Sequence, residues 1–242
     1  TRNLGRDFTE PWDGWLQSCL NFSREELGDY WLETYLTSRI WRFALSPGVC
    51  GSKAWAGAVM PSVDRVGRNF PMCIACALPP EAAACRAHDL GSAWFDRVEV
   101  ELLSALDDEH FEVGAFESRV VALGSVSDVV SLAVPELSVP AVPGALWRME
   151  LNGLAVGDDA GQMLHAVLKG AYGAYGMWWT AGSDYVKPSL LVTSGLPPAQ
   201  AFTAMIASQW EASGWHDSHR EPDAVGGVAN GVVQDENPMP RL

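Results

Sequence analysis

Apolar residues recur along the first positions of the chain with the period of an α-helix. The residues at i, i+3, i+4, i+7 and i+8 of this stretch are Trp12, Trp15, Leu16, Cys19 and Leu20. This spacing predicts an amphipathic helix, which Pro11 opens. Ser23 and Glu26 then form a capping-box pattern and predict the start of a second helix. Its stripe continues through Leu27, Tyr30, Trp31 and Tyr35. The chain is therefore expected to begin with a helical hairpin.

Three strand-like runs follow, at residues 39–46, 54–60 and 71–78. Each run is apolar at both alternating sets of positions, and Arg42 is the main interruption. A strand that is apolar on both faces is covered on both sides, so helices should flank this sheet. The connectors at 47–53 and 61–70 are too short to contain crossover helices. The three strands are therefore expected to form an antiparallel meander.

The remainder of the chain alternates between helical and strand patterns. Pro79, Pro80 and Glu81 are expected to open a long helix, and 116–123 reads as another helix. The apolar stripe of the long helix comprises Phe95, Val98, Leu102, Ala105 and Leu106. An extended connector at 134–144 with three prolines leads to a strand at 146–151 and a helix from Asp158 or Asp159.

The C-terminal part predicts a second hairpin, with strands at 177–182 and 189–194, and a last helix from Pro197 and Pro198 to near Gly214. The pattern as a whole predicts one α/β domain over residues 1–214, with a mixed, largely antiparallel sheet and helices on both faces. Residues 215–242 are polar and rich in Gly and Pro, which predicts a flexible tail.

The composition of the chain limits the classes of partner that it is expected to bind. Of the 242 residues 48% are apolar and 19% charged, which is globular composition, and the net charge is −14. Such acidity disfavours nucleic acid and anionic membranes as partners. No apolar run reaches the roughly 18 residues of a membrane helix. The five cysteines have no framework spacing, so we expect a reduced, cytoplasmic protein.

Motifs for metals, cofactors and nucleophiles give no strong candidate. The CxxC pair Cys73 and Cys76 lies inside an apolar strand, where residues three apart point to opposite faces. The histidine pair of HDSH (216–219) stands in the expected tail, and GAYGAYG (170–176) is best explained as a helix stop before a strand. GxxxxGK[ST], GxGxxG and GxSxG do not occur. We therefore expect no catalytic residue, no metal and no cofactor.

The stretch MPSVDRVGRNFPM, residues 60–72, is the richest candidate site. It carries Asp64, Arg65 and Arg68, with Gly67 able to adopt a positive φ angle. One interpretation is a polar turn between two strands, in which Asp64 bonds to the turn backbone and pairs with an arginine. The other is a binding role, because arginine offers planar bidentate contacts. The sequence leaves both open.

Six segments, taken in this order, resemble the TagF family (also called ImpM), accessory proteins of the bacterial type VI secretion system. They are PWDGWLQ (11–17), WRFALSPG (41–48), MPSVDRVGRNFP (60–71), WWTAGS (178–183), PSLL (188–191) and GLPP (195–198). The resemblance covers about residues 1–210. It implies a three-layer α/β sandwich, which agrees with the strands covered on both faces. A glycine- and aromatic-containing segment that family members usually carry ahead of the hairpin is not seen here.

The resemblance also implies a function. It points to a cytoplasmic regulator that represses the secretion apparatus after translation, with a forkhead-associated scaffold protein as its target. The family has no established catalytic residues. The motif and tryptophan positions expected to be structural are Trp12, Trp15, Trp41, Pro61, Ser62, Gly67, Phe70 and Pro71.

Three hypotheses follow. The first is a non-enzymatic regulator that binds other secretion proteins through some of Asp64, Arg65, Arg68, Trp178, Trp179 and Ser183. The second is a small-molecule or nucleotide-binding enzyme with a cleft formed by Asp64, Arg65, Arg68 and Ser183. The third is a subunit that assembles with itself, since the sequence does not determine the oligomeric state.

Overall fold

The structure is a computed structural model that describes residues 2–64, 67–79, 82–107, 111–126, 156–183 and 186–215. The expected connector at 134–144, the expected strand at 146–151 and HDSH (216–219) lie outside the described residues.

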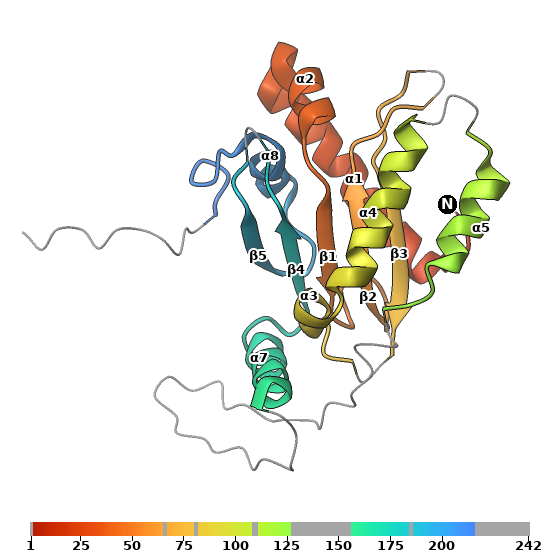
Figure 1. Ribbon diagram of the computed structural model, residues 1–242. Coiled ribbons are helices and arrows are strands. Elements are labelled where there is room, and N and C mark those ends of the chain that lie inside the picture. Colours follow the sequence, from red (N-terminus) through yellow and green to blue (C-terminus); the bar gives the residue numbers. More distant parts are fainter. Residues whose placement is uncertain are drawn as a thin grey trace, which may run out of the picture.

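The centre of the molecule is a five-stranded sheet (Figure 1). Its strands are β1 (Trp41–Leu45), β2 (Ala54–Met60), β3 (Met72–Leu78), β4 (Tyr175–Thr180) and β5 (Ser189–Ser194). The spatial order is β3-β2-β1-β4-β5, and every pairing among these strands is antiparallel. The predicted meander and the predicted second hairpin are both confirmed, and β1 joins them by pairing with β4.

Helices cover both faces of the sheet, as the sequence predicted (Figure 1). Phe43, Trp55 and Trp178 pack toward α1 (Arg6–Leu27) and α8 (Ala199–Ala207). The strand residues that alternate with these point to the other face of the sheet and pack toward α4 (Ser92–Asp107). On that face the small side chains of Ala56 and Ala58 leave room for α4 to lie close to β2. The result is a three-layer α/β arrangement with an apolar core on each side of the sheet.

The boundary between the two N-terminal helices lies later in the chain than predicted. A single helix, α1, continues through Ser23 to Leu27, and after a short 3₁₀ turn α2 spans Trp31–Thr37. Ser23 is not a helix cap: it is buried, donates to the carbonyl of Leu20 at 3.2 Å and accepts from the indole N–H of Trp31 at 2.9 Å. A tertiary hydrogen bond therefore explains a serine that resembled a local cap. Tyr30, expected in the apolar stripe, is exposed.

The long helix expected from residue 79 is interrupted. Residues 82–85 form turns, α3 spans Arg86–Leu90, and α4 begins at Ser92. Gly91 lies at the break. A Cβ atom there would come within 2.5 Å of the Ala87 carbonyl oxygen and 2.8 Å of Val126, so only glycine fits between these groups.

On the α4 side, α5 (Val113–Ala122) packs on α4, and α7 (Val156–Tyr172) contacts β4. Gly173, with a φ angle of 70°, ends α7. Strand β4 then begins at Tyr175, two residues earlier than predicted, so GAYGAYG is indeed a helix stop followed by a strand. Helix α8 ends at Ala207, short of the predicted end near Gly214. Trp215, assigned to the tail, donates its indole N–H to the carbonyl of Ala201 at 2.9 Å.

Candidate functional site

The connector between β2 and β3 is a small hairpin that prolongs the two strands. Val63 and Asn69 form an antiparallel bridge beyond the ends of the strands. The amide of Asp64 donates to the carbonyl of Arg68, and the amide of Gly67 donates to the carbonyl of Asp64, both at 2.9 Å. Gly67 has a φ angle of 80°, the conformation that the sequence predicted for it.

Asp64 orients Arg68 within this hairpin. Its two carboxylate oxygens accept from the main-chain N–H of Arg68 at 2.8 Å and from Nε of the same residue at 2.7 Å. The side chain of Arg68 is 80% exposed, and no described residue receives a hydrogen bond from its terminal nitrogens. The carboxylate therefore fixes a guanidinium group whose outer edge points into solvent. Arg65 lies outside the described residues.

The base of the connector is anchored to α2. The hydroxyl of Tyr35 accepts from the amide of Ser62 at 3.0 Å and donates to the carbonyl of Ser62 at 3.1 Å. Burial raises the pKa of Tyr35 to about 12, so this hydroxyl keeps its proton at neutral pH. Sequence reasoning did not find this anchor, because the two residues are joined only in the tertiary structure.

A hollow of about 970 Å³ lies beside the connector. Asp64, Arg68 and Phe70 line one side of it, and Leu106 of α4 and Val113 of α5 line the other. Phe70, Leu106 and Val113 are each close to half exposed. Leu106 was expected to belong to a buried stripe, and its exposure corrects that expectation. The structural role expected of Phe70 stays a prediction. We call this space the first hollow.

A second hollow of about 720 Å³ adjoins the first and is also lined by connector residues. Leu36 and Arg39 at the end of α2, Leu103 of α4 and Ser183 after β4 contribute to its lining. Val63 and Leu106 line both hollows and form the ridge between them.

The cleft of the enzyme hypothesis, formed by Asp64, Arg68 and Ser183, is therefore divided between two hollows. Ser183 also belongs to a local turn, in which its amide donates to the carbonyl of Val186 and its hydroxyl accepts from the Val186 amide.

Trp178 and Trp179, two of the proposed binding residues, are core residues. Trp178 is fully buried and Trp179 is 9% exposed, and the two point to opposite faces of the sheet. They cannot act as surface anchors, because alternation along a central strand directs both into covered layers. The tryptophans expected to be structural are buried as well, and Trp15 and Trp41 donate their indole N–H groups to the carbonyls of Pro197 and Met205.

The described residues form no group of three or more His, Cys, Asp or Glu side chains that could hold a metal ion. Cys73 and Cys76 pack into opposite core layers, as their strand spacing predicted. Burial raises the pKa of each thiol, to about 12 for Cys50, which favours the protonated thiol over the reactive thiolate at neutral pH. None of the described helices combines the length and apolar composition that crossing a membrane requires.

Comparison with known proteins identifies the class of protein. A family model described as the TagF N-terminal domain, type VI secretion system-associated, matches residues 1–123. Among solved structures, the chain is similar to the crystal structure of PA0076 from Pseudomonas aeruginosa PAO1 at 2.05 Å resolution. The two chains share 37% sequence identity, and their structures superpose with a TM-score of 0.67. The match covers 86% of this chain and 88% of that one. A comparison with curated proteins gave no match.

The protein is thus an α/β accessory protein associated with type VI secretion. The chain belongs to the TagF family.

Proposed function

We propose that the chain is a non-enzymatic regulator that represses the type VI secretion system after translation, by binding another protein of that system in the cytoplasm. The observation that carries the proposal is Arg68, which Asp64 holds in place beside the half-exposed Phe70 and Leu106. A fixed arginine beside apolar side chains is typical of the residues that dominate protein interfaces.

The partner we propose is the forkhead-associated scaffold protein of the same system, which the family resemblance implies. Purified scaffold and purified chain should form a complex in a pull-down and in calorimetry at micromolar concentrations. No complex under these conditions would contradict this choice of partner and leave the fold assignment unaffected.

Arg68→Ala separates binding from folding. An exposed ion pair contributes about 1 kcal/mol or less, so the free energy of unfolding in urea should change by no more than that. Scaffold binding and repression of secretion should fall clearly.

Arg6→Ala is the matched control, because Arg6 is also exposed and also pairs with a carboxylate four residues away, Glu10. This control should leave binding unchanged. A loss of several kcal/mol in Arg68→Ala would instead show that the arginine is structural.

The alternative is a small-molecule or nucleotide-binding enzyme. The first hollow favours it, since about 970 Å³ lies within the range of ligand pockets. The geometry supports it less well, because Asp64 is engaged by Arg68 and Ser183 lines the other hollow. A thermal-shift screen of nucleotides and metabolites tests it: a ligand that raises the melting temperature of the wild type but not of Asp64→Asn would favour this alternative.

A further inference from the structure

The two hollows belong to one apolar surface at the end of the sheet. They share the ridge formed by Val63 and Leu106. The large apolar side chains that line them and remain more than one-third exposed are Leu36, Val63, Phe70, Leu103, Leu106 and Val113. Scattered apolar residues need no explanation on a protein surface, but a contiguous group around two concavities is typical of a binding site. We call this group the two-hollow surface.

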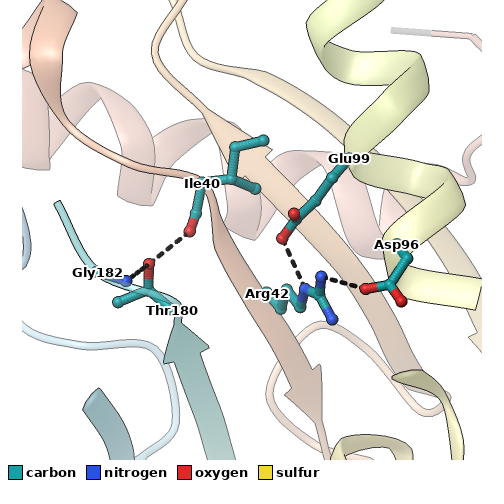
Figure 2. Close-up of polar contacts among 6 residues, drawn as sticks. All are labelled: Ile40, Arg42, Asp96, Glu99, Thr180 and Gly182. Atoms are coloured by element: carbon teal, nitrogen blue, oxygen red, sulfur yellow. Dashed lines mark hydrogen bonds and ion pairs between the residues drawn. The ribbon is translucent and has the colours of Figure 1, made fainter. Parts of the chain in front are cut away.

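The carboxylates around the two-hollow surface are already compensated by positive charge. Two of its carboxylates are already paired: Asp64 with Arg68, and Glu99 with Arg42, whose Nε lies 2.6 Å from the Glu99 oxygen (Figure 2). A third, Glu112, directly precedes α5, where a negative charge compensates the helix dipole.

The arginines of the two-hollow surface keep hydrogen-bond donors available for a partner. Arg39 is exposed in the second hollow, and no hydrogen bond or ion pair joins it to another described residue. In the first hollow, the terminal nitrogens of Arg68 likewise form no hydrogen bond or ion pair with a described residue. Within the described part of the chain, each hollow therefore presents a guanidinium group that can bind a carboxylate in bidentate fashion. On a chain with a net charge of −14, such a pair of available cations marks the place where an acidic segment can approach.

Hydrogen bonds hold the wall of the second hollow in place. The hydroxyl of Thr180 donates to the carbonyl of Ile40 at 2.9 Å and accepts from the amide of Gly182 at 3.2 Å, which ties the segment after β4 to the start of β1 (Figure 2). On the other side of the ridge, Tyr35 anchors Ser62. A surface fixed in this way loses little conformational entropy on binding.

We propose that the two-hollow surface binds a single acidic, amphipathic segment of the partner. The segment places one apolar side chain in each hollow, on either side of the Val63–Leu106 ridge, and directs carboxylates to Arg39 and Arg68. This inference rests on the proposed function, and it adds the chemistry of the recognised segment together with roles for Arg39 and Leu103.

The test starts from the complex of the full chain with the forkhead-associated scaffold. A photo-crosslinking amino acid is placed at Leu103 in the second hollow, at Val113 in the first, and at Val100 as the control. Val100 is on α4, is 64% exposed and lines neither hollow. The inference expects crosslinks from 103 and 113 to map to one acidic, apolar segment of the scaffold, and no crosslink from 100. Crosslinks to separate domains of the scaffold, or to a basic segment, would overturn it.

Charge reversal gives the second arm. Arg39→Glu and Arg68→Glu should each weaken scaffold binding by about tenfold or more, because like charges then face each other across the contact. Arg6→Glu, at an arginine 89% exposed on α1, should change it less than about twofold. Replacing the crosslinked carboxylate of the scaffold by arginine should restore binding to Arg39→Glu.

The outcomes separate the two proposals. If the scaffold binds the wild type, Arg39→Glu and Arg68→Glu with equal affinity, the inference is overturned while the proposed regulator stands. If the scaffold does not bind the wild type, the proposed partner fails and the inference fails with it.

Discussion

The partly buried His165 is a residue whose surroundings favour its neutral form. Its Nδ1 lies 2.6 Å from the hydroxyl of Tyr175, which also accepts from the amide of Cys85 at 3.2 Å. Burial lowers the pKa of His165, and the nearby Lys169 lowers it further. A neutral imidazole can accept a hydrogen bond from the hydroxyl of Tyr175, and this contact links α7 to β4.

This environment predicts a pH dependence. Below about pH 6.5 the unfolded chain protonates His165, whereas the folded chain resists protonation until a lower pH. The unfolded state then binds more protons, so the free energy of unfolding falls as the pH drops. Between pH 7.5 and 5, wild-type stability in urea should fall more steeply than that of His165→Gln. Equal slopes for the two proteins would show that His165 titrates normally.

At the scale of elements, strand β2 packs so tightly that it requires glycine at its centre. A Cβ atom on Gly57 would come within 2.4 Å of the Ile74 carbonyl oxygen, 2.6 Å of the Phe43 ring and 2.9 Å of the Ala75 Cα. The two backbone atoms belong to the neighbouring strand β3, so a side chain at 57 would push the strands apart. Gly14, on the exposed side of α1, has no such neighbours within 4 Å.

The same substitution should therefore have opposite effects at these two positions. Gly57→Ala should lower the free energy of unfolding by about 1–3 kcal/mol through overpacking. Gly14→Ala should raise it by about 0.5–1 kcal/mol, because alanine is the better helix former. Urea unfolding of both variants measures the two effects. A neutral Gly57→Ala would mean that the sheet adjusts without strain.

At the scale of the whole molecule, one ion-pair network joins the sheet to the α4 layer. Arg42, the residue that interrupts the apolar pattern of β1, reaches Glu99 at 2.6 Å and Asp96 at 2.7 Å on α4 (Figure 2). Its side chain is largely buried and also lies over the ring of Phe95. The charged residue that interrupts the apolar pattern of β1 therefore forms a polar contact between the sheet and α4.

Removing only one partner of this network should be costly. Arg42→Met leaves the carboxylate of Glu99 largely buried without its cation, and we expect a loss of about 1–3 kcal/mol in the free energy of unfolding. Arg42→Met combined with Glu99→Leu should recover much of that loss, since no charge is then left unpaired. A double variant as unstable as the sum of the single ones would show that the two residues contribute independently.

The sequence by itself determined the strands of the meander and the second hairpin, the coverage of the sheet on both faces and the turn at Gly67. These features follow from local chemistry: apolar residues on both faces of a strand, short connectors and a glycine where φ is positive. The opposite orientations of Cys73 and Cys76 follow from strand geometry alone.

Only the tertiary structure decided where Ser23, Trp178, Trp179 and Leu106 belong, because their environment comes from residues far away in sequence. Pairing with β1 and β5 places β4 inside the sheet, where the two core layers cover Trp178 and Trp179. The indole of Trp31 donates to Ser23, so the apparent helix cap is a buried acceptor. The two hollows exist because the connector, α2, α4 and α5 meet at one end of the sheet. Periodicity reports which face of an element is apolar, but not whether another element covers it.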